Sequence, residues 1–194
     1  AVRYYVMGER SVEELATDEE IQKMADIVGE SMDGGAVGFS TNRYPPHVGP
    51  DGRSIPGTYA EAKELLEIAK VVGEKRGLMQ NVLDFGGQPE FSVKLLKDLA
   101  STTRDRILFS MGTGPDLESG KRVRGLLKEL CSEGGDITAI SQPRSSGFMF
   151  GLQSGLPFAG ETWDQLRTKD LKGRLAAIRD TETRNKLIQE ASAS

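Results

Sequence analysis

The stretch from residue 58 to residue 85, TYAEAKELLEIAKVVGEKRGLMQNVLDF, decides the fold class because it joins a helix directly to a strand. Thr58 and Glu61 have the spacing of a capping box, in which the first side chain caps a helix start and the second reaches back to it. Apolar residues then recur at helical spacing over 65–72, and a short apolar run at 78–85 follows. We therefore predict a capped helix that leads through a short turn into a buried strand.

The same alternation continues on both sides of this unit. Thr17 and Glu20 form a second capping box before a helix that ends at a glycine pair, and another helix follows Pro89. The predicted strands lie at 36–41, 78–85, 106–111 and 136–141, with a further helix around 117–131. Strands and helices that alternate at this spacing are typical of a parallel sheet covered by helices.

Four strands leave two α/β architectures open. A closed (β/α)8 barrel has eight strands and about 250 residues, so a chain of 194 residues with four strands would be part of one. A small open sheet of the flavodoxin type is the alternative, and it predicts a glycine-rich phosphate-binding turn after a strand. Residues 112–114, Gly-Thr-Gly, are the best candidate for that turn, but they lack the rest of a dinucleotide fingerprint and a P-loop lysine.

The composition excludes several classes of function. A net charge of −4 and a pI near 5.2 argue against a nucleic-acid-binding face, which would be basic. The sequence shows neither a membrane-spanning apolar stretch nor a signal-peptide pattern. The single cysteine, Cys131, fits a reducing compartment, so we expect a cytoplasmic protein and a small buried thiol on a helix. The first eight residues have the character of a fold interior, which suggests a piece of a longer protein.

The chemistry of parallel α/β folds gathers at the carboxyl ends of the strands. Those ends supply Ser40, Arg43, Gln142 and Arg144, and His47 follows in a proline-rich loop. An arginine fork can hold a substrate carboxylate, and a histidine can act as an acid, a base or a hydrogen-bond donor. We predict these five residues as substrate contacts. The chain has one histidine and one cysteine on different elements, so we predict no metal ligand set within it.

Five segments together resemble one enzyme family. They are, in chain order, YVMGER (5–10), GAVGFST (35–41), DGRSIPGT (51–58), ISQPR (140–144) and RDTETR (179–184). Their order and spacing are similar to those of the N-acyl-D-amino-acid deacylases of the amidohydrolase superfamily, and the similarity extends over nearly the whole chain.

This resemblance implies a zinc-dependent hydrolase that cleaves the linear amide of an N-acyl amino acid on a (β/α)8 barrel. It also exposes two departures, because the two strand ends that carry central histidines in the family align here with Val82 and Met111. Valine cannot bind zinc, and a methionine thioether is a poor zinc ligand. Zinc is therefore implied for a parent protein, without a ligand set in this chain.

The resemblance favours a partial (β/α)8 TIM-barrel segment with sequential parallel strands and flanking helices. We expect the inward-facing side chains of such a segment to be apolar near the strand starts and polar near the strand ends, which Asn81, Ser110 and Gln142 should reach. We expect residues 1–194 to form one such segment, with βα units over 1–141 and a loop and short helices over 142–194. We expect the segment to be inactive alone and to pair with the rest of a barrel or with itself, since a partial barrel has open sheet edges. The alternatives are a non-catalytic scaffold on a degenerate barrel and an open α/β sheet that binds a phosphorylated ligand.

Overall fold

The computed structural model describes residues 1–49, 51–85, 87–102, 106–111, 117–141, 151–153 and 155–193. They form two compact units, Ala1–Pro143 and Arg144–Ser194. None of the helices in the described ranges is long and apolar enough to cross a membrane.

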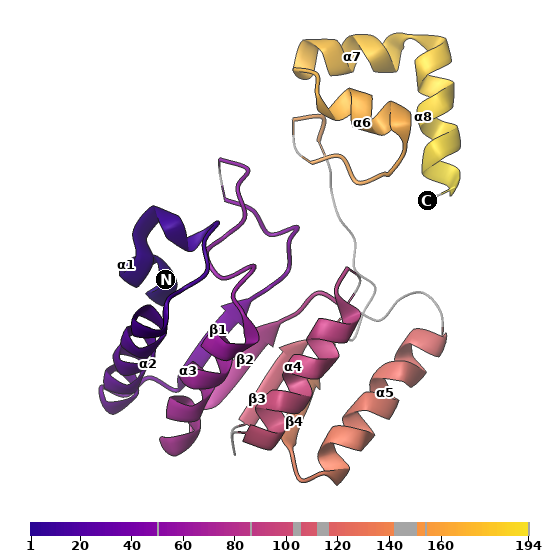
Figure 1. The fold of residues 1–194 in the computed structure, drawn as a ribbon. Coiled ribbons are helices and arrows are strands. Elements are labelled where there is room, and N and C mark those ends of the chain that lie inside the picture. The colour runs from indigo at the N-terminus through magenta and orange to yellow at the C-terminus, as the bar shows by residue number, and fades with distance from the viewer. Residues whose placement is uncertain are drawn as a thin grey trace. The chain divides into compact units, whose positions relative to one another are not determined.

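The first unit contains a four-stranded parallel sheet (Figure 1). Its strands are β1 (Gly38–Asn42), β2 (Leu78–Val82), β3 (Arg106–Ser110) and β4 (Asp136–Ile140), and they lie side by side in chain order. Sequential parallel neighbours are what barrel-type βα units produce, whereas a doubly wound sheet changes direction at a switch point. The predicted strands and the sequential order are therefore confirmed, and the open flavodoxin-type sheet is not the fold.

Helices precede and connect these strands (Figure 1). The chain begins with the short helix α1 (Val2–Met7) and the 3-10 helix η1 (Gly8–Ser11). The longer helices are α2 (Asp18–Asp33), α3 (Ala62–Glu74), α4 (Pro89–Thr102) and α5 (Leu117–Ser132). Between the helices and the sheet lies the main core, in which Leu65, Leu96, Met79 and Phe109 are buried.

The two predicted capping boxes have different outcomes. At α2 the Glu20 N–H donates to the Thr17 hydroxyl oxygen at 3.3 Å and the Thr17 N–H donates to the Glu20 carboxylate at 2.9 Å, so this box is confirmed. The box at Thr58 and Glu61 is wrong. The Thr58 hydroxyl donates instead to the Ile55 carbonyl at 2.9 Å, and α3 begins only at Ala62 with Glu61 as its N-cap. A local turn has taken the threonine hydroxyl that the helix would need.

The two faces of the sheet differ in what covers them. Every second side chain of β2 and β3 points toward the helices and is buried, namely Met79, Asn81, Ile107 and Phe109. The residues between them lie on the opposite face, which we call the open face, and the strand register sets them in three rows. From the strand starts to the strand ends, the rows are Gly38, Leu78, Arg106 and Asp136; Ser40, Gln80, Leu108 and Thr138; and Asn42, Val82, Ser110 and Ile140. All of these residues are half-buried or exposed.

This pattern corrects two expectations. Asn81 would reach the interior of a barrel only from the open face, but it is fully buried on the helix side, where its Nδ2 donates to the Met79 carbonyl at 3.2 Å. The strand starts were expected to be apolar, yet Arg106 and Asp136 form an ion pair there, 3.7 Å apart. Because side chains alternate with a period of two, a shift of one residue in an assumed register moves every side chain to the other face.

The second unit consists of three helices, α6 (Glu161–Arg167), α7 (Leu171–Arg179) and α8 (Thr181–Ala193). The Glu190 carboxylate on α8 accepts the backbone N–H groups of Thr162 and Trp163 at the start of α6 and the Thr162 hydroxyl at 2.6 Å. At the other end of α6, the Arg174 guanidinium donates to the carbonyls of Leu166 and Arg167. Side chains from α7 and α8 thus satisfy both ends of a helix that is only seven residues long.

Cys131 is exposed, so the prediction of a buried thiol is wrong. It lies in the last turn of α5, next to Leu130, which is fully buried against the sheet. On a helix, adjacent residues point about 100° apart, so only one of the two can face the core.

Candidate functional site

Two polar side chains meet on the open face in the middle of β1 and β2. Ser40 lies on the open face and donates a hydrogen bond from its hydroxyl to the Gln80 side-chain carbonyl of the neighbouring strand. The register pairs these two residues directly, so they are cross-strand neighbours on one face. Ser40 was predicted from the sequence and Gln80 was not, although the period-two alternation of side chains along β2 places Gln80 on the same face.

The loop after β1 returns to the strand end and brings His47 to Asn42. The Asn42 Nδ2 atom lies 2.6 Å from His47 Nδ1, and the Tyr44 N–H donates to Asn42 Oδ1 at 2.9 Å. The Tyr44 and His47 rings contact edge to face, with centroids 5.1 Å apart. The predicted position of this loop, at the carboxyl end of the sheet, is therefore observed, and the His47 side chain is exposed there.

Arg43 points in a different direction from Ser40. Its backbone N–H donates to the Val82 carbonyl at 2.8 Å and extends the β1–β2 pairing by one residue. Its side chain turns toward the helices, is only 7% exposed, and places its guanidinium 4.1 Å from the centroid of the Phe91 ring on α4. Arg43 Nη1 is buried and has no hydrogen-bond partner among the described residues.

A buried ion pair lies close enough to Arg43 to affect it electrostatically. Arg3 and Glu64 form this pair, and Arg3 also donates to the Ser11 carbonyl at 2.9 Å and to the Glu14 carbonyl at 2.5 Å. Burial lowers the pKa of Arg43, an effect that Glu64 opposes and Arg3 reinforces. Burial also raises the pKa of Glu64, although the Arg3 charge opposes that rise. The cluster holds two guanidinium groups and one carboxylate, and so carries one surplus positive charge when all three are ionised.

The described residues do not fit a zinc site. Val82 occupies the last position of β2 on the open face, and Met111 directly follows β3. Within the described ranges, no three His, Cys, Asp or Glu side chains converge on one point. His47 Nδ1 is already in contact with the Asn42 amide. A structural zinc ion needs four such ligands and a catalytic one needs three, so this part of the chain does not supply them.

Two of the predicted contacts, Gln142 and Arg144, lie outside the described residues, as do residues 112–114. Of the five predicted contacts, the structure thus brings His47 to the carboxyl-terminal end of the sheet and places Ser40 in the middle of β1 on the open face. It turns the side chain of Arg43 toward the helices. Asn42 and Gln80 join the site as residues that sequence analysis did not select.

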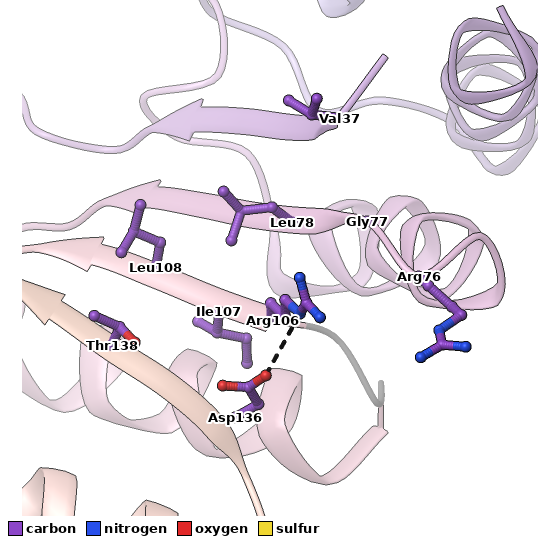
Figure 2. A pocket seen from close by; sticks show the side chains of 9 residues that line it. All are labelled: Val37, Arg76, Gly77, Leu78, Arg106, Ile107, Leu108, Asp136 and Thr138. Atoms are coloured by element: carbon purple, nitrogen blue, oxygen red, sulfur yellow. Dashed lines mark ion pairs between the residues drawn. The ribbon is translucent and has the colours of Figure 1, made fainter. Parts of the chain in front are cut away.

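A hollow of about 420 Å³ lies at the opposite end of the sheet (Figure 2). The hollow lies near the strand starts, where it is lined by Val37, Leu78, Arg106 and Asp136. The ion pair between Arg106 and Asp136 is part of this lining. Catalytic residues of parallel α/β enzymes come from the carboxyl ends of strands rather than from their starts. We therefore interpret this hollow as the part of the open face next to the strand starts and not as the functional site.

No protein-family model matches the chain, and no curated protein matches it in sequence. Two solved structures of D-aminoacylase share its fold, each with a TM-score of 0.60 and 20% identity. One belongs to a study of the binuclear metal centre of that enzyme, and the other is a mutant in complex with CuCl2. A weaker likeness, with a TM-score of 0.42 and 15% identity over 66% of this chain and 31% of the other, is to L-hydantoinase from Arthrobacter aurescens. Each D-aminoacylase match covers 74% of this chain and 28% of the enzyme, so the chain has the fold of a segment of D-aminoacylase.

Proposed function

We propose that the chain is one segment of an amidohydrolase barrel whose parent protein hydrolyses the linear amide of N-acyl amino acids. The observation that carries this proposal is the sequential four-stranded parallel sheet, which has the fold of part of D-aminoacylase. The family resemblance of the sequence segments supports the same substrate class. We also propose the cytoplasm as its compartment, because the chain contains a single cysteine.

In this proposal the segment contributes substrate contacts. His47 offers a polar group at the carboxyl end of the sheet, where a barrel enzyme binds its substrate, and Ser40 offers one on the open face in the middle of β1. Gln142 and Arg144 remain proposed contacts at the end of β4. Arg43 would contact a substrate carboxylate only after its guanidinium turned away from the Phe91 ring.

The metal expected from the family would have to be held elsewhere. Zinc, or the binuclear centre studied in D-aminoacylase, needs imidazole, thiolate or carboxylate ligands, whereas Val82 and Met111 stand at two strand ends of this segment. We therefore propose that any metal of the parent protein is bound by residues outside the described ones.

The open face and the sheet edges indicate what the segment pairs with. Among the described strands, β1 and β4 each pair along one side only. Ile140 on β4 is 49% exposed, and apolar Leu78, Val82 and Leu108 lie on the same face. Uncovered edges and apolar faces favour association, so we propose that the remaining strands of a barrel, or a second copy in their absence, cover them.

The test is hydrolysis by the purified parent protein. N-acetyl-D-leucine and N-acetyl-L-leucine form a matched pair that differs only in configuration, and release of free leucine is measured for each. We expect release from the D-isomer and loss of activity with a metal chelator. If the parent hydrolysed no N-acyl amino acid of either configuration, with or without added zinc, the proposal would be wrong.

A non-catalytic scaffold is the second candidate, and the apolar residues Val82 and Met111 favour it. Such a protein would bind a small amide without turning it over. It should purify without stoichiometric metal, and calorimetry would then show binding of N-acetyl-leucine without release of leucine. Metal content measured together with turnover separates the two candidates.

A further inference from the structure

His47 is the only histidine of the chain, and its ring is held at one nitrogen. Asn42 Nδ2 lies 2.6 Å from His47 Nδ1, and the His47 backbone N–H donates to the Tyr44 carbonyl at 3.0 Å. The neutral imidazole has two tautomers, and the partner of one nitrogen decides which is present. The contact of Asn42 with Nδ1 therefore decides whether the other nitrogen, Nε2, carries the ring proton.

The orientation of the Asn42 amide follows from a third residue. The Tyr44 backbone N–H can only donate, and it points at Asn42 Oδ1 at 2.9 Å. Reversing the amide would place its NH2 group against that N–H, leaving two donors face to face. The Asn42 oxygen therefore belongs on the Tyr44 side, and its NH2 group belongs on the His47 side.

An amide NH2 group can only donate a hydrogen bond, so His47 Nδ1 must accept it through its lone pair. A neutral ring with a bare Nδ1 carries its proton on Nε2. We propose that Asn42 is a positioning residue that fixes His47 in the Nε2–H tautomer, so that His47 presents a hydrogen-bond donor to an acceptor oxygen of a ligand. The chemical class of that ligand is a carboxylate or an amide carbonyl.

The Nε2–H tautomer excludes some of the roles that the sequence left open for His47. Nε2 bears the proton, so it is neither the lone pair of a general base nor a metal ligand in this arrangement. Nδ1 is engaged by Asn42, so it is not free for these roles either. The tautomer follows from the contacts alone, whereas the identity of the ligand as an N-acyl amino acid rests on the proposed function.

Nitrogen-15 NMR of the labelled 194-residue chain tests the tautomer, because its one histidine gives one set of ring signals. The spectra are recorded at alkaline pH, so that the two tautomers of the neutral ring are compared. We expect Nδ1 at the chemical shift of a bare nitrogen and Nε2 at that of a protonated one. In Asn42→Asp the carboxylate accepts from Nδ1–H instead, so the two shifts should exchange. Asn185→Asp adds the same charge on α8 and should change nothing.

Protonated Nδ1 in the unmodified protein, or unchanged ring shifts in Asn42→Asp, would overturn the assignment. The same spectra are recorded in the parent protein, where His47→Gln identifies the His47 signals by their loss. This second measurement holds even if the 194-residue chain does not fold alone.

The donor role is tested separately in the parent by the kinetics of N-acetyl-leucine hydrolysis. His47→Gln keeps an N–H donor on the side chain and should leave KM within about threefold of the original, whereas His47→Ala should raise KM about tenfold. A KM unchanged in His47→Ala would overturn the donor role. A parent that hydrolyses no substrate would remove the proposed function and leave the tautomer result standing, so the two failures are distinguishable.

Discussion

The Arg43 guanidinium lies 4.1 Å from the centroid of the Phe91 ring and is buried there, and its Nη1 has no hydrogen-bond partner in the part of the chain that the structure describes. A desolvated cation–π contact contributes about 2 kcal/mol, whereas taking an ion out of water costs several kcal/mol. The aromatic ring therefore offsets only part of the cost, which agrees with the pKa of Arg43 being lowered by burial. Arg43 is a residue whose charge costs stability in the folded protein.

Replacing Arg43 by methionine should therefore not destabilise the protein. The methionine keeps most of the apolar stem and removes the buried charge, so the free energy of unfolding should stay equal or rise by about 1–2 kcal/mol. Urea denaturation measures it, with Arg122→Met on the exposed surface of α5 as the matched control. A loss of more than about 1 kcal/mol in Arg43→Met would show that the guanidinium stabilises the fold.

Arg3→Met should have the opposite effect. It leaves Glu64 buried without its ion-pair partner and also removes the hydrogen bonds to the Ser11 and Glu14 carbonyls. Breaking a buried pair from one side costs about 3–5 kcal/mol. Arg10→Met is the control, because Arg10 pairs with Glu14 and Glu20 near the surface and its loss should cost no more than about 1 kcal/mol. Equal effects of the two substitutions in urea denaturation would contradict this account.

The pH dependence of the second unit should depend on Glu190. Hydrogen bonds from Thr162, and from the Trp163 N–H, hold the pKa of the Glu190 carboxyl below its ordinary value. A depressed carboxyl pKa adds stability that is present above the unfolded-state pKa and is lost as the pH falls through the folded-state pKa. The stability difference between the original protein and Glu190→Gln should therefore be largest above about pH 5 and shrink at lower pH.

Trp163 is the only tryptophan, and it packs against Phe158 and donates to the Leu187 carbonyl at 3.0 Å. Its fluorescence during urea unfolding thus reports on this unit directly. A stability difference that stayed constant between pH 3 and pH 7 would contradict the role assigned to Glu190, since one carboxylate pKa then could not explain it.

The 194-residue chain alone should release no leucine from N-acetyl-D-leucine. Its described residues bring no three His, Cys, Asp or Glu side chains together, so the segment offers no ligand set there for a metal. The assay is run with and without added zinc, and with the parent protein as the positive control. Zinc-dependent release by the chain alone, abolished by a chelator, would refute this expectation.

Sequence patterns were sufficient for the sheet and for most helices. Strand positions and their parallel, sequential order follow from alternation, and the Thr17–Glu20 capping box is local in sequence. The capping box predicted at Thr58 was wrong because a turn to Ile55 competes for the Thr58 hydroxyl. The sequence pattern does not show which of the two hydrogen bonds forms. The prediction for Asn81 was wrong because the face on which a side chain lies depends on the register of its strand. A shift of one residue in that register moves the side chain to the other face.

The site was predictable only where its contacts are local. Asn42 and His47 are five residues apart, so a loop that folds back could be suspected from sequence. Arg3 and Glu64 are separated by 61 residues, and only the packing of the N-terminal segment against α3 brings them together. The direction of the Arg43 side chain likewise depends on Phe91, which lies on α4, three elements after β1.

The central claim is that this sheet is part of a closed barrel in the parent protein, because the proposed substrate site requires the other strands. Hydrogen exchange of the parent measures closure directly, since backbone amides at an unpaired sheet edge exchange faster than those in a paired ladder. We predict that peptides from the outer strands β1 and β4 exchange as slowly as those from the inner strands β2 and β3. Rapid exchange in β1 and β4, with protection confined to β2 and β3, would show that the sheet stays open and would contradict the account.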